Sequence, residues 1–255
     1  MLPPLSALLP AETWAYLLVF ARVGAMVAAM PVVGETMAPQ RVKLMIALGL
    51  TLALTPAVLA NPGMPPNFAM LASLVAGEIV LGLALGILGR LVMSAVNVAG
   101  TIVATQMGLA FATSVDPSQE GQGAVVGAFL NLTAIAMIFA TDLHHLLIAA
   151  VRQSYDLFPS GGIPPTAEMA QWSAQLMSAA FATGVQIAAP FLVFGIVFNV
   201  AAGVVSRLMP QVQIFFLVAP LTILGGFVLL MFGLSAMMAV FLKFFETSLR
   251  PLAGG

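Results

Sequence analysis

Glu78 is the first candidate functional residue of this sequence, because it is an ionisable residue inside an apolar block that runs from about Phe68 to Gly89. An ionisable group in an apolar segment is costly to bury, so it is a functional candidate by default. Glu78 could pair with a base from another helix, coordinate a cation or relay protons. The plainer alternative is one pairing or capping contact where two helices meet. The sequence leaves these roles open.

A second polar group consists of Asp142, His144 and His145, which lie close together at the end of another apolar block. Zinc proteases carry two histidines four residues apart on one helix face, with a glutamate between them. Adjacent histidines point about 100° apart on a helix, so one metal ion could bind both only with unusual geometry. We expect this group to mark a helix end that meets water or lipid headgroups.

The chain shows no residue pattern of a familiar catalytic or cofactor site. It lacks cysteine, and it contains neither the Gly-x-Ser-x-Gly motif of serine hydrolases nor a Walker motif for nucleotide phosphates. We therefore expect no catalytic residue, no bound cofactor and no metal centre.

The composition indicates which solvent surrounds most of the chain. Of the 255 residues, 61% are hydrophobic and only 7% are charged, whereas a soluble domain carries about 25% charged residues. So few charges cannot cover a water-facing surface, which excludes a soluble monomer and predicts contact with lipid or with other apolar chains. The net charge of −1 argues against a basic face for nucleic acid.

Charges and proline clusters divide the sequence into apolar blocks long enough for membrane helices. This pattern predicts an all-α membrane protein with about six long apolar, kinked helices. The last two blocks exceed the ~20 residues that one span needs, and Pro190, Pro210 and Pro220 interrupt them, which favours kinked or protruding helices. Another block ends at Arg90. The blocks cover about residues 13–30, 42–60, 68–89, 91–115, 124–141, 169–206 and 208–242.

Two glycine pairs have the spacing of close helix contacts. Gly82 and Gly86 lie four residues apart, as do Gly123 and Gly127, and small residues at this spacing let two backbones approach. Glycine is also simply common in membrane helices, so we expect close packing at these positions rather than a specific dimer motif.

The segment from Gln106 to Gly123 mixes glycine, serine and glutamine with apolar residues between two apolar blocks. Non-helical backbone at membrane depth survives only where it is buried in protein or lines a cavity. We interpret the segment as lining or blocking a passage. In the alternative, a plain surface loop, Met107 and Phe111 would be oddly apolar.

The order and spacing of several short stretches resemble a known family. The stretches are Arg22–Pro31, Pro39–Lys43, Glu78–Gly86, Ala99-Gly100, Gln106–Ala112 with Asp116-Pro117, Ala189-Pro190 and Arg207–Phe215. Each is weak alone, but together they resemble the FliR family of flagellar export-gate proteins over nearly the whole chain. Relatives of that family in injectisomes belong to the same type III secretion group.

The resemblance implies a non-enzymatic subunit of an export gate, a hetero-oligomeric channel in the bacterial inner membrane at the flagellar basal body. Its implied partners are FliP-like and FliQ-like subunits, FlhB-like and FlhA-like export components, and unfolded protein substrates. By the same analogy residues 1–157 form a FliP-like part, 158–168 a connecting loop and 169–255 a FliQ-like helical hairpin.

The resemblance also assigns roles to individual residues. A plug loop at 106–123 would place in or near the closed pore Gln106, Met107, Gly108, Leu109, Phe111, Ala112, Asp116, Pro117, Gly121 and Gly123. The residues expected at packing or assembly contacts are Glu78, Gly82, Gly86, Gly100, Pro190, Arg207 and Pro210.

Two other function classes compete with this interpretation. A secondary transporter of a small solute could use the buried Glu78, but such transporters are built from internal repeats, and the sequence shows none. An intramembrane enzyme would use Glu78 or the group around His144, but it lacks a recognisable nucleophile or ligand set.

Overall fold

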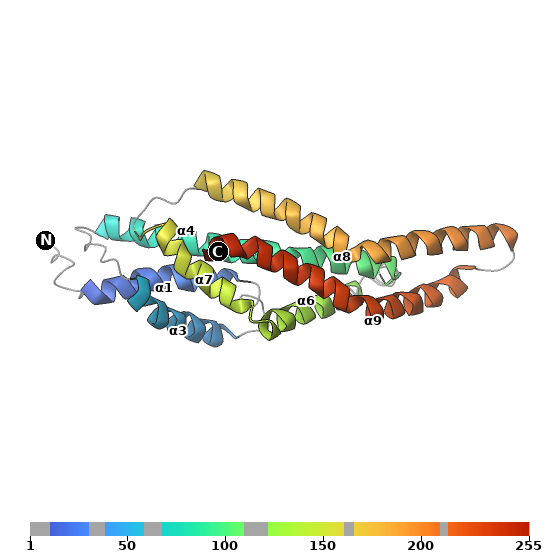
Figure 1. The fold of residues 1–255 in the computed structure, drawn as a ribbon, viewed down its shortest axis with the longest axis horizontal. Coiled ribbons are helices and arrows are strands. Elements are labelled where there is room, and N and C mark those ends of the chain that lie inside the picture. Colours follow the sequence, from blue (N-terminus) through green and yellow to red (C-terminus); the bar gives the residue numbers. More distant parts are fainter. Residues whose placement is uncertain are drawn as a thin grey trace. The chain divides into compact units, whose positions relative to one another are not determined.

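The computed structural model describes residues 11–30, 39–58, 68–109, 122–160, 166–209 and 214–254, and all regular structure in these residues is helical. The prediction of an all-α fold is therefore confirmed. The helices, in chain order, are α1 (Ala11–Ala29), α3 (Gln40–Val58), α4 (Phe68–Gln106), α6 (Gln122–Ala140), α7 (His144–Leu157), α8 (Thr166–Leu208), α9 (Ile214–Leu249) and the short 3₁₀ helix η3 (Arg250–Ala253) (Figure 1).

Four of these helices, namely α3, α4, α8 and α9, are long and apolar enough to cross a membrane, and α6 with α7 makes a fifth if the two form one broken span. The expected number of about six is close to this count for the described residues. A helix suits lipid because it satisfies every interior backbone hydrogen bond within one segment.

One expected boundary is absent, and one of the prolines lies inside a continuous helix. The helix α4 continues through Arg90 for 39 residues, about 58 Å, and α8 continues through Pro190 for 43 residues. Both side chains are exposed. An outward arginine can carry its charge away from the helix on its long stem, and an apolar helix tolerates the single backbone hydrogen bond that a proline removes. The helix α9 also continues through Pro220 and through the two adjacent glycines Gly225 and Gly226.

The chain divides into two compact units. Unit 1 comprises residues 1–92, 143–176 and 247–255, and unit 2 comprises residues 93–142 and 177–246. In unit 1, α1 packs against α3, and α7 packs against η3 (Figure 1). The buried core here is made of Val19, Val23, Met26, Val27, Met30, Ala47, Leu54, Val151 and Tyr155.

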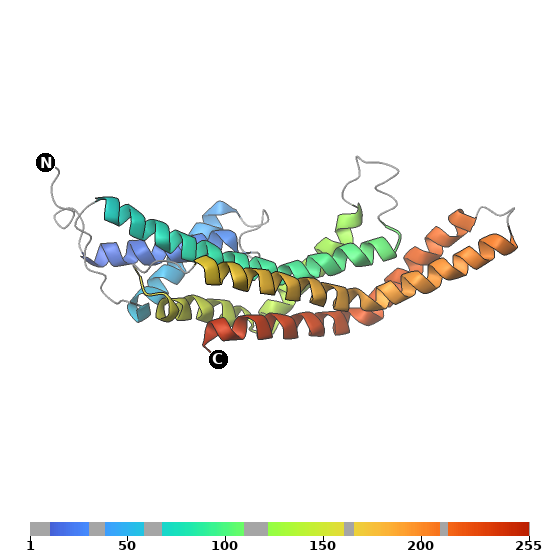
Figure 2. The same ribbon diagram turned by 90° about the horizontal axis from the view of Figure 1, so that it is seen from above.

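Unit 2 contains the end of α4, the helix α6 and most of α8 and α9. Figures 1 and 2 both show the second half of α8 beside the first half of α9, as an antiparallel hairpin. The two helices approach closely at Gly225, where a Cβ atom would lie 2.9 Å from the ring of Phe194.

Polar side chains inside these apolar helices bond mostly to their own backbone. The hydroxyl of Thr51 donates to the carbonyl of Ala47 at 2.7 Å, and that of Thr55 donates to Thr51 at 2.6 Å. The amide of Asn199 donates in the same way to Gly195 at 2.8 Å. Such local bonds let a polar residue occupy an apolar helix without a partner helix.

Candidate functional site

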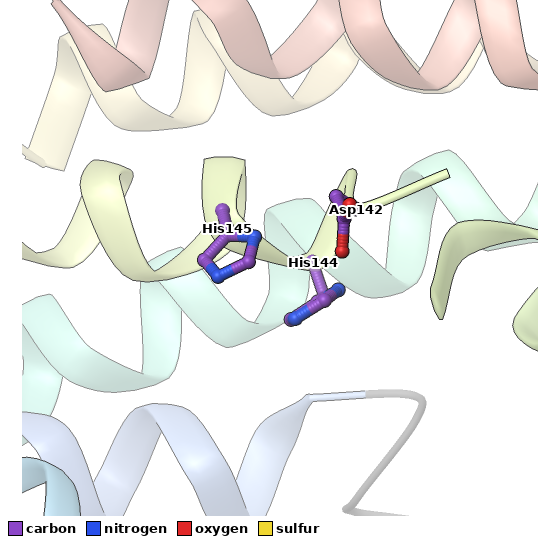
Figure 3. Close-up of side chains that lie close together, drawn as sticks. All are labelled: Asp142, His144 and His145. Atoms are coloured by element: carbon purple, nitrogen blue, oxygen red, sulfur yellow. The ribbon is translucent and has the colours of Figure 1, made fainter. Parts of the chain in front are cut away.

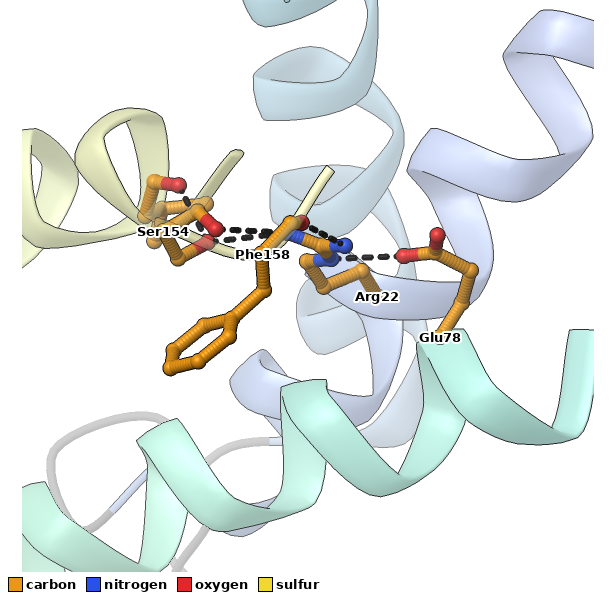
Figure 4. A network of polar contacts seen from close by, with 5 residues as sticks. Arg22, Glu78, Ser154 and Phe158 are labelled. Carbon is orange, nitrogen blue, oxygen red and sulfur yellow. Dashed lines mark hydrogen bonds and ion pairs between the residues drawn. The ribbon is translucent and has the colours of Figure 1, made fainter. Parts of the chain in front are cut away.

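The most concentrated polar chemistry of unit 1 is an ion pair between α1 and α4. The Nε atom of Arg22 lies 2.6 Å from Oε2 of Glu78, and the two side chains are 0% and 1% exposed (Figure 4). A charge-assisted bond of this length is among the stronger contacts in a protein. Glu78 is thus engaged by a base from another helix and closed off from its surroundings, which disfavours a solute path through its carboxylate.

The rest of the Arg22 guanidinium binds the C-terminal end of α7. Nη1 donates to the backbone oxygen of Ser154 at 3.1 Å and to its hydroxyl at 3.2 Å, while Nη2 donates to the backbone oxygen of Phe158 at 2.9 Å (Figure 4). The C-terminal end of a helix carries the negative end of its dipole, so its carbonyl oxygens suit a cation, even though the oxygen of Ser154 also accepts from the amide of Phe158 at 2.9 Å. Arg22 therefore joins α1, α4 and the end of α7.

An aromatic ring completes the surroundings of Arg22. The guanidinium carbon lies 3.9 Å from the ring centroid of Tyr155, a cation–π distance. Among the described atoms, Oε1 of Glu78 and the hydroxyl of Tyr155 are buried without a hydrogen-bond partner. One positive and one negative charge balance here, and the arrangement acts as a fixed link between helices.

The sequence pointed to Glu78 but not to its partner. Arg22 is the single charged residue of the first apolar block, as Glu78 is of the third. Two isolated charges of opposite sign in separate apolar blocks were the available signal, since buried charges are paired. No comparable signal marked Ser154 or Tyr155.

Gly82 and Gly86 allow the ion pair to form, because they bring α4 onto the backbone of α1. A Cβ atom on Gly82 would collide with the backbone oxygen of Arg22, and one on Gly86 would collide with the Cβ of Ala29. The two backbones thus touch directly where Arg22 and Glu78 meet, the contact that small residues permit in membrane proteins.

Unit 2 has an equivalent contact between α4 and α6. A Cβ atom on Gly100 would lie 2.6 Å from the Cα of Gly127. The same stretch of α4 also meets α8, where a Cβ on Gly184 would lie 2.8 Å from the backbone oxygen of Ala95. Gly123 lies in the first turn of α6. Glycines therefore set the helix spacing in unit 2 as they do in unit 1.

The start of the expected plug loop is the end of α4. Gly108 has φ +76°, its amide donates to the carbonyl of Thr105 at 3.1 Å, and the amide of Leu109 donates to Ala104 at 3.1 Å. This pair of bonds is the Schellman motif that ends helices at a glycine. Gly108 thus has a defined structural task, which is to stop α4.

Gln106 and Met107 are held in unit 2 next to this cap. Met107 is fully buried, and a Cβ on Gly226 of α9 would lie 2.5 Å from its Cγ. Gln106 packs its side-chain amide against Gly195 of α8. The apolar character of Met107 is explained by this burial.

The remaining predicted residues are placed as follows. Pro190 is exposed on α8, and Arg207 is exposed in its last turn. Five pore candidates and one packing candidate lie outside the described residues, namely Phe111, Ala112, Asp116, Pro117, Gly121 and Pro210. The structure therefore brings together Gln106, Met107, Gly108 and Leu109 at the end of α4.

Asp142 lies in the turn that precedes α7, and His144 and His145 are the first two residues of that helix (Figure 3). The two imidazole rings are tilted, with centroids 4.2 Å apart, and one potential ligand atom from each of the three residues falls within 4.8 Å of the others. The two rings lie near each other although the residues are adjacent in α7, and their planes are tilted by 34°. Asp142 has φ 58°, a left-handed turn conformation that aspartate adopts more readily than most residues.

Comparison with known proteins gives a consistent set of matches. A family model described as bacterial export proteins, family 1, matches residues 13–248. The flagellar biosynthetic protein FliR of Caulobacter vibrioides is 42% identical over 88% of this chain and 89% of its own length. FliR of Escherichia coli is 32% identical over 86% and 84%. The Yop proteins translocation protein T of Yersinia pestis is 29% identical over 69% and 68%.

Proposed function

This chain belongs to family 1 of the bacterial export proteins, and from that membership we propose that it is a non-enzymatic subunit of the export gate of a flagellar type III secretion system. The observation that carries the proposal is the 42% identity with a flagellar biosynthetic protein along 88% of the chain. The similarity to a translocation protein of Yersinia pestis supports the broader role in protein export.

In this role the chain forms a channel with FliP-like and FliQ-like subunits in the inner membrane at the flagellar basal body. It also meets FlhB-like and FlhA-like components. Large apolar side chains that stay outside the fold support an assembly in lipid, such as Met45, Leu52 and Phe232, which are 72%, 63% and 75% exposed. Exposed apolar surface on this scale requires lipid or partner chains.

The chain has two parts in this proposal. Residues 1–157 act as a FliP-like part and residues 169–255 as a FliQ-like hairpin, with 158–168 as the connection. The antiparallel hairpin of α8 and α9 supports the second assignment (Figure 2).

The segment 106–123 closes the channel at rest. A hydrophobic constriction excludes water and ions without any covalent chemistry, and methionine and phenylalanine side chains can yield around a passing polypeptide. The anchoring of Met107 beneath α9 and the cap at Gly108 support a plug that leaves the helix from a fixed point.

Secretion from the native bacterium tests the proposed function. Removing the gene should abolish release of flagellar filament protein into the medium, and supplying it again should restore release. Unchanged secretion without the gene would contradict the proposal.

The plug has a separate test. Deleting residues 110–121 keeps the cap at Gly108, so the complex should still assemble while the membrane becomes permeable to ions. If the complex assembles after the deletion and the membrane stays impermeable to ions, the segment does not act as a plug.

A further inference from the structure

One side of α4 changes character along the helix. Between residues 93 and 106 the exposed positions are Asn97, Thr101 and Thr105, all of them polar. Earlier in the helix, in unit 1, the exposed side chains are mostly apolar, such as Leu83 and Ile87, which are 40% and 47% exposed. At about 100° per residue all five lie within ~80° of one another around the helix axis. The same side of α4 is therefore apolar in unit 1 and polar in unit 2.

The exposed polar positions continue into the cap of the helix. Gly108, which ends α4 with φ +76°, is exposed as well, and we call Asn97, Thr101, Thr105 and Gly108 the α4 polar stripe. Its length is ~16 Å at 1.5 Å per residue, which matches about five residues of extended polypeptide. No charged residue occurs in α4 after Arg90. The stripe is thus polar, uncharged and continuous with the point from which the proposed plug leaves the helix.

The groups that the stripe offers outward follow from its local hydrogen bonds. The hydroxyl of Thr101 donates to the carbonyl of Asn97 at 3.0 Å, and that of Thr105 donates to the carbonyl of Thr101 at 2.8 Å. Both hydroxyl oxygens keep acceptor capacity, and the carboxamide of Asn97 adds two N–H donors and a further acceptor. Local bonds let threonine occupy an apolar helix on any side, so they do not explain why these residues share the exposed side.

A different side of unit 2 is apolar at the same level. Gly100 of α4 lies against Gly127 of α6, where a Cβ on Gly100 would lie 2.6 Å from the Cα of Gly127. Phe129 follows two residues later, ~200° around α6, so it points away from α4. Phe129 is 46% exposed, and Leu132 in the next turn is 58% exposed. Unit 2 therefore carries a polar and an apolar surface at one level along α4.

These two surfaces require different surroundings. Exposed apolar side chains of this size require lipid or partner chains, whereas polar side chains of membrane helices face a bundle interior or a water-filled cavity. A helix pair that only protruded into bulk water would have no use for the apolar surface. The wall of a channel carries both, one surface toward the lumen and the other toward lipid or neighbouring subunits.

We propose that the α4 polar stripe faces the water-filled lumen of the export channel and is the surface along which an unfolded export substrate passes. An extended substrate presents backbone N–H and C=O groups, and the amide and hydroxyl groups of the stripe can bind them. Since the stripe is uncharged, it neither retains nor repels charged stretches of the substrate. The inference rests on the proposed function, because it requires a channel that carries unfolded polypeptide.

Photocrosslinking to a stalled substrate tests the stripe directly. The probe is flagellar filament protein fused to a domain that folds too stably to be exported, so that the fusion stops inside the channel. The photoreactive amino acid p-benzoylphenylalanine replaces Thr101 in one version of the chain and Phe129 in the matched control. Position 101 should link to the stalled substrate, and position 129 should link to lipid or to a neighbouring subunit.

Adducts of position 101 with phospholipid alone, or with an apparatus subunit alone, would overturn the proposal, because the stripe would then face lipid or pack against a helix. The stalled fusion also blocks export of the natural filament protein, which shows that it occupies the channel. If position 101 gives no more substrate adduct than position 129 under that block, the proposal is wrong.

Apolar substitutions on the stripe give a second, independent test. The double variant Asn97→Leu with Thr101→Leu places two apolar side chains on the proposed lumen wall, which disfavours water there. Because both positions are exposed, the variant should fold and recover its partner subunits in normal amounts. Secretion of filament protein should fall about tenfold, a rise of ~1.4 kcal/mol in the barrier to transit, whereas Phe129→Leu should leave secretion unchanged.

Normal secretion by the double variant would overturn the proposal. The same holds if a double variant that is present in the membrane and resists protease loses its partner subunits, because the stripe would then be an assembly contact. If the double variant does not fold, the crosslinks of position 101 decide.

The proposed function and the stripe fail separately. If secretion continues without the gene, the proposed function fails. If secretion requires the gene but position 101 does not link to the stalled substrate, only the assignment of the stripe fails.

Discussion

The Nε atom of Arg22 lies 2.6 Å from Oε2 of Glu78, inside unit 1, and the same guanidinium reaches the end of α7 at Ser154 and Phe158. One side chain thus links three segments that lie far apart along the chain. The pair is buried, so its loss leaves a charge that the surrounding apolar side chains cannot solvate. Arg22 is therefore a buried polar link between α1, α4 and the end of α7.

Arg22→Leu should lower the free energy of unfolding by about 3–5 kcal/mol, because it leaves the Glu78 carboxylate buried without its cation. Thermal unfolding in mild detergent, or the steady-state amount in the membrane, measures the effect. A second variant with Glu78→Leu added should recover part of the loss. No recovery would show that the contacts of Arg22 with α7, rather than the ion pair, carry the stability.

Arg22→Lys should also destabilise unit 1, by about 1.5–3 kcal/mol, the range of hydrogen bonds to charged groups. A lysine ammonium cannot present the planar fork that serves Glu78, Ser154 and Phe158 together. The free energies of unfolding of the natural chain and the Arg22→Lys variant are compared in the same detergent. Equal stability would mean that charge alone holds this site.

Gly82→Ala should destabilise unit 1, because its Cβ would collide with the backbone oxygen of Arg22. Gly49→Ala is the control, since its Cβ meets nothing within 4 Å. An alanine in an open helix position is about 0.5–1 kcal/mol more favourable than glycine. The two variants should therefore shift the unfolding temperature in opposite directions, and a shift in the same direction would contradict the contact.

Gly108→Ala should cost about 1–2 kcal/mol through backbone strain alone, because φ is +76° and the added Cβ has open space. Gly108→Asn should cost less, since asparagine adopts the left-handed conformation more readily. The variants are compared by the unfolding of unit 2, which is monitored through the protease sensitivity of α4. Equal tolerance of alanine and asparagine would argue against the cap.

The all-α fold was predictable because the composition and the long apolar blocks indicate a chain surrounded by lipid. The helix boundaries were less predictable. Arg90 was expected to end a block, yet α4 continues through it with the side chain exposed. Pro190 was expected to favour a kinked helix, and it lies inside the continuous helix α8. Both residues face outward, and that orientation depends on packing that periodicity does not reveal.

The candidate site divides in the same way. Glu78 stood out because a lone charge in an apolar block is costly wherever it packs. Its partner Arg22 did not, because the pairing depends on how α1 and α4 cross. The contact of Gly100 with Gly127 also joins different helices, and sequence spacing describes only glycines on the same helix. Met107 was unusual as a loop residue, and its burial against α9 supplies the reason.

Affinity purification from the native membrane is the most direct test of whether the chain belongs to a protein-export apparatus. The tagged chain, extracted in mild detergent, should bring FliP-like and FliQ-like subunits in constant proportion, identified by mass spectrometry. Recovery of the chain alone, monodisperse and without these subunits, would contradict the account.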